Sequence, residues 1–242
     1  MTKQKTQKIT KEIKGWLDDQ EGELLYDLAQ NCDDQGVIVE IGSYQGKSAV
    51  WLGAGSDSGS KTKVYTIDPH QWENNLGELK NNISKAELND LIIPICQTSK
   101  SASQNFFQPI NLLFIDGDHD FNAVKTDFEA WVPKIINNGL IAVHDAITEK
   151  HKGTRQIIEK KILKSKKFSN VQWVKTTLVA QKCQANFYNS LKKYILFILI
   201  HFKLIIVLRK IKNKTNKLVG QIGKFIKKHN PALYYQLKKW KK

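Results

Sequence analysis

The chain has 242 residues, 41% of them hydrophobic, a length and composition that suit one α/β domain with an appendage. Its formal net charge of +15 is uneven, since residues 1–159 carry 16 Lys and Arg against 23 Asp and Glu, whereas residues 160–242 carry 22 Lys and Arg and no acid. Three scattered cysteines without a C-x-x-C pair argue against a disulfide framework or a cysteine-based zinc site, and favour a reducing compartment.

The N-terminal segment is polar and charged and has no apolar core, so it does not resemble a signal peptide. We expect residues 1–10 to be frayed. Apolar residues at helical spacing predict two short helices, one around Ile13–Leu17 and one around Leu24–Ala29, with a polar break at Asp18–Glu23.

Strands and helices then alternate along the chain. Apolar runs predict strands at residues 37–41, 63–67, 91–96, 110–116 and 140–143, followed by a closing pair at 171–176 and 177–182. Helices are expected at residues 71–91, 99–107, 121–131 and 150–167. Pro94 places the third strand at an edge, and Asn138-Gly139 predicts a turn.

This alternation is typical of a Rossmann-like, doubly wound α/β fold with a mostly parallel sheet and right-handed crossovers. We expect a seven-stranded sheet with a C-terminal strand hairpin in residues 1–185. Residues 186–242 are expected to form a basic, amphipathic helical tail.

The stretch Val37–Gly53, VIVEIGSYQGKSAVWLG, joins a buried strand to a helix through a glycine turn. Such turns bind nucleotides and nucleoside cofactors in α/β proteins. The spacing E-x-G-x-x-x-G differs from the dinucleotide pattern. A phosphate-binding loop is also excluded, because Ile41 stands where that loop requires glycine.

Four acids fall at the ends of predicted strands, namely Glu40, Asp68, Asp116 and Asp145. The carboxyl ends of parallel strands meet at one edge of a sheet, and ligands bind in the crevice outside it. One such acid would ordinarily cap a turn or helix. Four at one edge beside a glycine turn indicate a binding site.

An ordered set of motifs carries a family resemblance. Leu112–His119 reads LLFIDGDH, Trp131 and Pro133 follow on a helix, and Gly139 precedes a strand ending in His144-Asp145. Over roughly residues 12–183 the chain resembles class I S-adenosylmethionine-dependent methyltransferases. The nearer similarity is to the methyltransferase 24-like, sugar and small-molecule O-methyltransferase subgroup.

The resemblance implies S-adenosylmethionine as cofactor. Asp68 would bind its ribose and Ser99 would lie near its adenine. The full set of implied cofactor residues is Glu40, Gly42, Ser43, Tyr44, Gly46, Ser48, Asp68, Ser99 and Asp116.

Two catalytic schemes stay open. Asp116 and Asp145, with His144, would hold a divalent Mg²⁺ or Mn²⁺ ion that lowers the pKa of the acceptor hydroxyl. Without a metal, His119 or His144 would act as general base. Each histidine also has a structural alternative, a backbone-bonded loop residue for His119 and a satisfied sheet-edge residue for His144.

Nearby residues have simpler interpretations. Asp120 is expected to cap the following helix, and Trp131 is expected in the core.

The tail alternates apolar and basic residues. Tyr194–Leu208 is shorter than the about 20 residues that span a membrane and contains Lys203, and lysines interleave with apolar residues from Ile211 to Trp240. The pattern predicts an interfacial helix on anionic lipid. There are three alternatives. The tail could pack on the catalytic domain, pack on a second identical subunit, or bind the phosphates of RNA.

The expected function is methyl transfer to the hydroxyl of a sugar, glycan or other small acceptor, in the cytoplasm or peripherally at the inner face of the membrane. Two alternatives stand beside it. One is an RNA methyltransferase that uses the basic tail, although no Asn-Pro-Pro-Tyr-type motif follows the fourth strand. The other is a non-catalytic, membrane-associated adaptor with this fold.

Overall fold

The computed structural model describes residues 1–71, 74–183 and 193–198. Its centre is a seven-stranded sheet in the order β3-β2-β1-β4-β5-β7-β6. The strands are β1 (Val37–Ile41), β2 (Val64–Ile67), β3 (Ile92–Ile95), β4 (Ile110–Ile115), β5 (Ile135–Val143), β6 (Phe168–Val174) and β7 (Thr177–Lys182). The first five are parallel, and β7 runs antiparallel to both β5 and β6. This confirms the predicted sheet, its edge strand β3 and its closing hairpin.

The register of the parallel strands positions the site. Ile41 lies opposite both Ile67 and Ile115, and Ile115 lies opposite Val143. The strands β1, β2, β4 and β5 therefore end level with one another. The residues that follow them emerge at one edge of the sheet, as the strand-end acids predicted.

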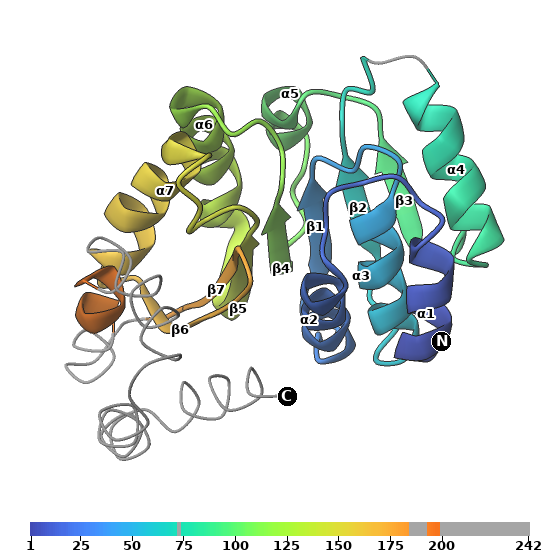
Figure 1. The fold of residues 1–242 in the computed structure, drawn as a ribbon, viewed down its shortest axis with the longest axis horizontal. Helices are drawn as coiled ribbons and strands as arrows, with labels where there is room; N and C mark the ends of the chain where they lie inside the picture. Colours follow the sequence, from blue (N-terminus) through green and yellow to red (C-terminus); the bar gives the residue numbers. More distant parts are fainter. Residues whose placement is uncertain (72–73, 184–192, 199–242) are drawn as a thin grey trace, which may run out of the picture. The chain divides into compact units, whose positions relative to one another are not determined.

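The helices form two groups (Figure 1). They are α1 (Lys3–Thr10), α2 (Asp19–Gln30), α3 (Lys47–Asp57), α4 (Asn75–Lys85), α5 (Ser99–Gln104), α6 (Phe121–Trp131) and α7 (Lys152–Ile158). Helices α1 to α4 pack on one another, and α6 packs on both α5 and α7. A 3₁₀ turn at Val132–Lys134 follows α6, and a π-helical turn at Glu159–Leu163 follows α7.

The N-terminal prediction was wrong in detail. The residues expected to be frayed form α1, and the Met1 amino group donates to Asp57 at 2.7 Å. The segment around Ile13–Leu17, expected to be helical, is irregular. Helix α2 begins inside the expected polar break because Asp18 caps it, in a capping box with Glu21.

The predicted turn at Asn138-Gly139 is instead part of β5. Asn138 takes a left-handed φ of 65°, and the register between β4 and β5 shifts between Ile110 and Leu112. Asn138 and Gly139 therefore lie in a bulge of residues 136–139 opposite Asn111, which interrupts the pairing with β4 without ending β5.

Two smaller predictions are confirmed. Trp131 is fully buried, and Asp120 caps α6 by accepting a hydrogen bond from the Asn122 amide at 2.8 Å.

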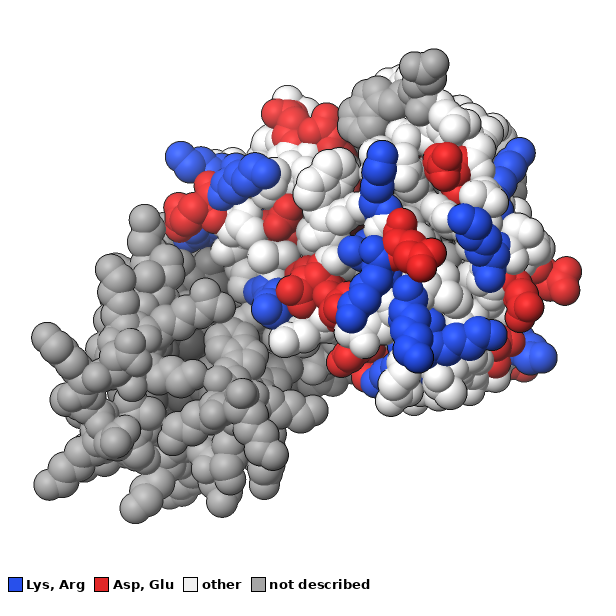
Figure 2. Space-filling view, turned by 45° about the vertical axis from the view of Figure 1, so that its right-hand side comes forward, with Lys and Arg blue, Asp and Glu red and all other residues white. Residues whose placement is uncertain are grey.

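Charged side chains of both signs are interspersed on the face of the domain shown in Figure 2. This agrees with composition, because residues 1–183 carry 23 Lys and Arg and 23 Asp and Glu. The seven lysines of residues 160–183 offset the net charge of −7 on residues 1–159, so the described domain is neutral overall and residues 184–242 account for the +15.

The predicted tail helices around Tyr194–Leu208 and Ile211–Trp240 lie outside the described residues, except for a helical segment at residues 193–198. Within the part of the chain that the structure describes, no helix is long and apolar enough to cross a membrane.

Candidate active site

The glycine turn after β1 presses against the end of β4. Gly42 has a φ of 89°, and a Cβ atom there would lie 2.2 Å from the carbonyl oxygen of Asp116. Gly46 has the same φ, and a Cβ atom there would lie 2.5 Å from Leu79 Cδ1. Both positions therefore favour glycine for their left-handed conformation, and Gly42 also needs it for space because its neighbour is backbone.

Backbone hydrogen bonds hold this turn in place. The Tyr44 amide donates to Asp68 Oδ2 at 2.9 Å, and Asn82 Nδ2 donates to the Gln45 carbonyl oxygen at 2.9 Å. Asp68 Oδ1 accepts a second bond, from the His70 amide at 2.8 Å. Asp68 thus ties the end of β2 to the turn, at the place where a ribose-binding acid was expected.

Two buried polar atoms beside the turn lack a hydrogen-bond partner among the described residues, Glu40 Oε1 and Ser43 Oγ. Glu40 is fully buried, and its other oxygen accepts a hydrogen bond from Thr66. Burial raises the pKa of Glu40 to about 7, although the nearby Ser48 and Thr66 hydroxyls act in the opposite direction. An unpaired carboxylate oxygen in such surroundings fits a cationic or hydrogen-bond-donating ligand.

Ser99, expected near adenine, has a structural partner. At the start of α5 its hydroxyl accepts a hydrogen bond from the Trp131 indole nitrogen at 2.8 Å. Ser99 therefore joins α5 to α6.

A chain of three ionisable groups, of which Glu21 and His144 are buried and Asp116 is partly exposed, lies at this edge of the sheet. His144 Nδ1 lies 2.9 Å from Asp116 Oδ1, and His144 Nε2 lies 3.3 Å from Glu21 Oε2. Glu21 Oε1 accepts four more hydrogen bonds, from the amides and hydroxyls of Thr176 and Thr177 at 2.7–3.0 Å. We call Glu21, His144 and Asp116 the inner network.

The inner network holds His144 as a cation. Burial disfavours its charged form, but hydrogen bonds with Asp116 and Glu21 raise the pKa of His144 to about 10. Burial also opposes ionisation of Glu21, yet hydrogen bonds from His144 and Thr176 lower its pKa to about 2. For Asp116, burial outweighs the neighbouring histidines and raises the pKa. His144 therefore has no free nitrogen to act as a base in this arrangement.

A second cluster lies beside the first, nearer the solvent. Asp145 Oδ2 lies 3.4 Å from His119 Nε2 and 3.2 Å from His151 Nε2. The two imidazole rings are 3.9 Å apart between centroids, with planes tilted by 32°. We call His119, Asp145 and His151 the outer cluster.

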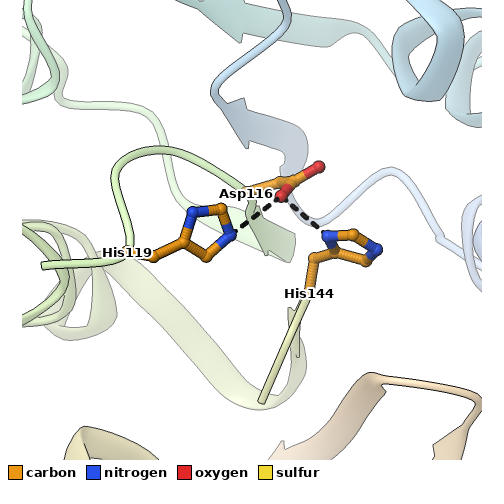
Figure 3. Close-up of side chains that lie close together, drawn as sticks. All are labelled: Asp116, His119 and His144. Atoms are coloured by element: carbon orange, nitrogen blue, oxygen red, sulfur yellow. Dashed lines mark hydrogen bonds and ion pairs between the residues drawn. The ribbon is translucent and has the colours of Figure 1, made fainter. Parts of the chain in front are cut away.

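His119 connects the two groups. In Figure 3, His119 and His144 both point at the carboxylate of Asp116, from opposite sides. The His119 Nε2 atom lies 3.9 Å from Asp116 Oδ1. Burial raises the pKa of Asp145 by itself, but the surrounding His119, His144 and His151 lower that pKa below its ordinary value.

The metal set expected from sequence, Asp116, His144 and Asp145, is divided between these groups. Among the described residues, metal-ligand atoms converge within 4.8 Å of one another in two sets. One is Asp116 with His119 and His144, and the other is His119 with Asp145 and His151. In the first set His144 is already bonded on both ring nitrogens.

A pocket of about 310 Å³ opens next to these groups. It is lined by Trp16, Asp18, Glu21, His144, Asp145, Thr148, Lys150, His151, Lys175 and Thr176. Trp16 is 79% exposed, and its ring centroid lies 5.3 Å from that of Tyr44 in the glycine turn. Trp16 therefore connects the glycine turn to the pocket, which Asp145 and His151 of the outer cluster also line.

Three residues of this site were missed from sequence. Glu21 carried a signal, the D-x-x-E capping-box spacing from Asp18, but nothing local pairs it with His144. Trp16 was assigned to a helix face. His151 lies 32 positions after His119 and comes close to it only through the packing of α7.

Comparison with known proteins agrees with the fold. Residues 39–146 match the model of a family described as "Methyltransferase domain". An O-methyltransferase from Bacillus cereus, solved in complex with SAH, is similar over 74% of this chain and 90% of its own, at 19% identity and a TM-score of 0.59.

Two other solved structures are similar in the same way. The O-methyltransferase TomG from Streptomyces achromogenes, in complex with SAM, matches over 75% of this chain and 89% of its own, at 18% identity and a TM-score of 0.57. An rRNA methylase from Streptococcus thermophilus matches over 66% of this chain and 95% of its own, at 18% identity and a TM-score of 0.52. Residues 39–146 therefore match a methyltransferase-domain family, and the chain shares the fold of these solved methyltransferases.

Proposed function

We propose that this protein transfers the methyl group of S-adenosylmethionine to a hydroxyl oxygen of a sugar, glycan or other small acceptor. The observation that carries the proposal is the pair of unpartnered buried atoms beside the glycine turn, Glu40 Oε1 and Ser43 Oγ. The ammonium group of S-adenosylmethionine would donate to Glu40. That contact would relieve the cost of burying an unpaired carboxylate oxygen.

The turn supplies the remaining contacts. Gly42 and Gly46 leave the backbone open to close approach, since neither carries a Cβ atom. Asp68 follows β2 at the position that suits the ribose hydroxyls, and α5 with Ser99 would flank the adenine. When bound, the cofactor supplies a sulfonium-linked methyl group that is open to nucleophilic attack.

The acceptor would occupy the pocket beside the turn. Trp16 offers an exposed aromatic face, on which the apolar face of a sugar ring or another flat acceptor can stack. As the bond from acceptor oxygen to methyl carbon forms, the sulfur–carbon bond breaks and the hydroxyl proton must leave. His119 is the base we favour, because its Nε2 has no hydrogen-bond partner among the described residues while both nitrogens of His144 are bonded.

Radiolabelled S-adenosylmethionine tests this proposal with a panel of sugars, nucleotide sugars, glycans and phenols, with ribosomal RNA alongside. We expect label in a small acceptor, in a bond that survives mild alkali as a methyl ether does. Label in the alkali-labile fraction would indicate a carboxyl acceptor and contradict the proposal. Transfer to RNA alone would establish the RNA methyltransferase alternative.

We also propose that the tail holds the enzyme at an anionic membrane surface. Residues 184–242 carry 15 Lys and Arg and no acid, whereas residues 1–183 are neutral overall. The apolar run at residues 195–200, ILFILI, gives lipid an advantage over nucleic acid, because phosphate binding needs no such run.

The full-length chain distinguishes these partners. We expect it to sediment with vesicles that contain phosphatidylserine, and less with purely zwitterionic vesicles. If it stays in the supernatant at low salt yet retards RNA on a gel, the membrane proposal is wrong.

A further inference from the structure

The outer cluster brings three metal-ligand atoms together from three separate places in the chain. His119 follows β4, Asp145 follows β5, and His151 immediately precedes α7. Asp145 Oδ2 lies 3.4 Å and 3.2 Å from the Nε2 atoms of the two histidines, and all three atoms lie within 4.8 Å of one another. Only one of the three, Asp145, belongs to the metal set that the sequence suggested.

These atoms lie at ion-pair distance, but the contacts leave His119 Nε2 without a well-aligned hydrogen bond. His119 Nε2 is a buried atom with no hydrogen-bond partner among the described residues, although Asp145 Oδ2 is close. A buried ring nitrogen that lies beside a carboxylate, in a ring stacked on a second imidazole, needs an explanation. A shared cation supplies one, because each ligand would then direct a lone pair to the same point.

The spacing fits a small tetrahedral ion. Zinc binds histidine nitrogen and carboxylate oxygen at about 2.0–2.2 Å, so neighbouring ligands in a tetrahedral site lie roughly 3.3–3.6 Å apart. The distances from Asp145 Oδ2 to the histidine nitrogens, 3.2 and 3.4 Å, lie close to that range. Two imidazoles with one carboxylate favour Zn²⁺ or a similar transition metal over Mg²⁺, which prefers oxygen ligands.

We propose that His119, Asp145 and His151 form a binding site for a divalent transition-metal ion, with Zn²⁺ as the best match, and with a fourth position open to the pocket. Three protein ligands and one open position are the arrangement of catalytic rather than structural zinc sites. The inner network adjoins this site, since His119 Nε2 lies 3.9 Å from Asp116 Oδ1, but His144 is not a ligand because both of its ring nitrogens already have partners.

The backbone around the cluster is built to bring the ligands together. A Cβ atom on Gly153 would lie 2.4 Å from the His119 carbonyl oxygen and 2.5 Å from the Phe121 amide nitrogen, so glycine lets α7 approach the loop that bears His119. The His151 amide donates to Thr148 Oγ1 at 3.2 Å. Asp145 has a left-handed φ of 52°, a conformation that costs energy in most residues and is often retained at functional positions.

The role of the metal rests on the proposed function. Asp145 and His151 line the pocket, so an acceptor hydroxyl could occupy the open position. A bound metal would lower the pKa of such a hydroxyl so that its proton could pass to solvent, and His119 would then serve as a metal ligand in place of the base role proposed above.

Metal binding can be measured without any methyl transfer. The full-length protein is freed of metal with a chelator, titrated with Zn²⁺ by calorimetry, and titrated with Co²⁺ by visible absorption. We expect one high-affinity Zn²⁺ per chain and a Co²⁺ spectrum typical of a four- or five-coordinate nitrogen and oxygen site. Loss of a residue that only hydrogen-bonds to a metal ligand weakens metal affinity by about 10–100-fold. His119 and His151 are proposed as direct ligands, so His119→Ala and His151→Ala should each weaken Zn²⁺ affinity by at least about 100-fold.

Asp118→Asn is the matched control, because Asp118 lies in the same loop but is absent from the metal-ligand sets among the described residues. We expect it to bind Zn²⁺ as the wild type does. Absence of stoichiometric Zn²⁺ and Co²⁺ binding by the wild type, or unchanged affinity in both histidine variants, would overturn the proposal.

Calorimetry with S-adenosylmethionine in the same samples separates this inference from the proposed function. If the cofactor binds and the metal does not, only the metal site is wrong. If the metal binds and the cofactor does not, the proposed function fails and the metal site stands.

Discussion

The inner network and the outer cluster use the same residue types and differ in what they leave available. In the inner network both nitrogens of His144 are bonded, and the side chain is only 5% exposed. In the outer cluster His119 is 30% exposed, and its Nε2 has no hydrogen bond among the described residues. The comparison shows that a histidine near strand-end acids can act as a base or a metal ligand only where those acids leave one of its ring nitrogens free.

Substitution of Glu21 would break the inner network most severely. Glu21→Ala removes one carboxylate from a buried cation and leaves Thr176 and Thr177 without their acceptor. Breaking a buried ion pair costs about 3–5 kcal/mol, so urea unfolding should show a loss of this size. Glu23→Ala, on the exposed side of the same helix, should change the free energy of unfolding by less than about 0.5 kcal/mol. Equal losses of unfolding free energy in both variants would mean that the inner network contributes nothing to the stability of the fold.

The glycine turn, which lies against Asp116, is the next most sensitive point. In Gly42→Ala the new Cβ atom meets the Asp116 carbonyl oxygen, and alanine must take a φ of 89°. We expect destabilisation of roughly 2–4 kcal/mol by urea unfolding, together with weaker cofactor binding. Gly117→Ala is the control, because its Cβ atom would lie no closer than 3.5 Å to another group. If Gly117→Ala were as destabilised as Gly42→Ala, the close approach would not be the cause.

The inner network predicts that stability declines at alkaline pH. The pKa of His144 is raised to about 10 in the folded state, against about 6.5 in an unfolded chain, so its contribution is complete below pH 6.5 and is lost as pH rises toward 10. Between pH 6.5 and 9.5 we expect the stability advantage of the wild type over His144→Gln to shrink by roughly 2–3 kcal/mol. Lysine, tyrosine and cysteine titrate in both proteins and largely cancel.

Imidazole ¹⁵N spectra provide a direct check on this pH prediction. The His144 ring should keep both protons up to about pH 9. Deprotonation of His144 near pH 6.5 would show that the two carboxylates do not hold its charge.

A smaller effect, on Zn²⁺ affinity, is expected from a change that moves α7 and with it His151 of the outer cluster. Gly153→Ala should push the start of α7 away from the loop that bears His119, and should weaken Zn²⁺ binding by about 10-fold in calorimetry. Gly77→Ala in α4 is the control, because its Cβ atom would meet only the movable end of the Asn74 side chain. Unchanged Zn²⁺ affinity in Gly153→Ala would mean that the outer cluster tolerates movement of His151.

The sequence predicted which residues follow the strands at the site, because strand ends are set by local sequence patterns. Each strand is a short apolar run, and the residue after each run is fixed by its position, so the apolar pattern alone places Asp68, Asp116 and His144 at one edge of the sheet. Sequence could not separate the inner network from the outer cluster. That separation depends on Glu21 arriving from α2 and His151 from α7, through packing between elements distant in the chain.

The binding of S-adenosylmethionine tests the central claim most directly. Equilibrium dialysis with labelled cofactor should show one site per wild-type chain. Glu40→Gln should bind about 10–100-fold more weakly, because it loses a charge-assisted hydrogen bond of about 1.5–3 kcal/mol. Glu87→Gln, an exposed carboxylate away from the turn, should bind as the wild type does. No binding by the wild type at millimolar cofactor, or equal binding by Glu40→Gln, would contradict the account.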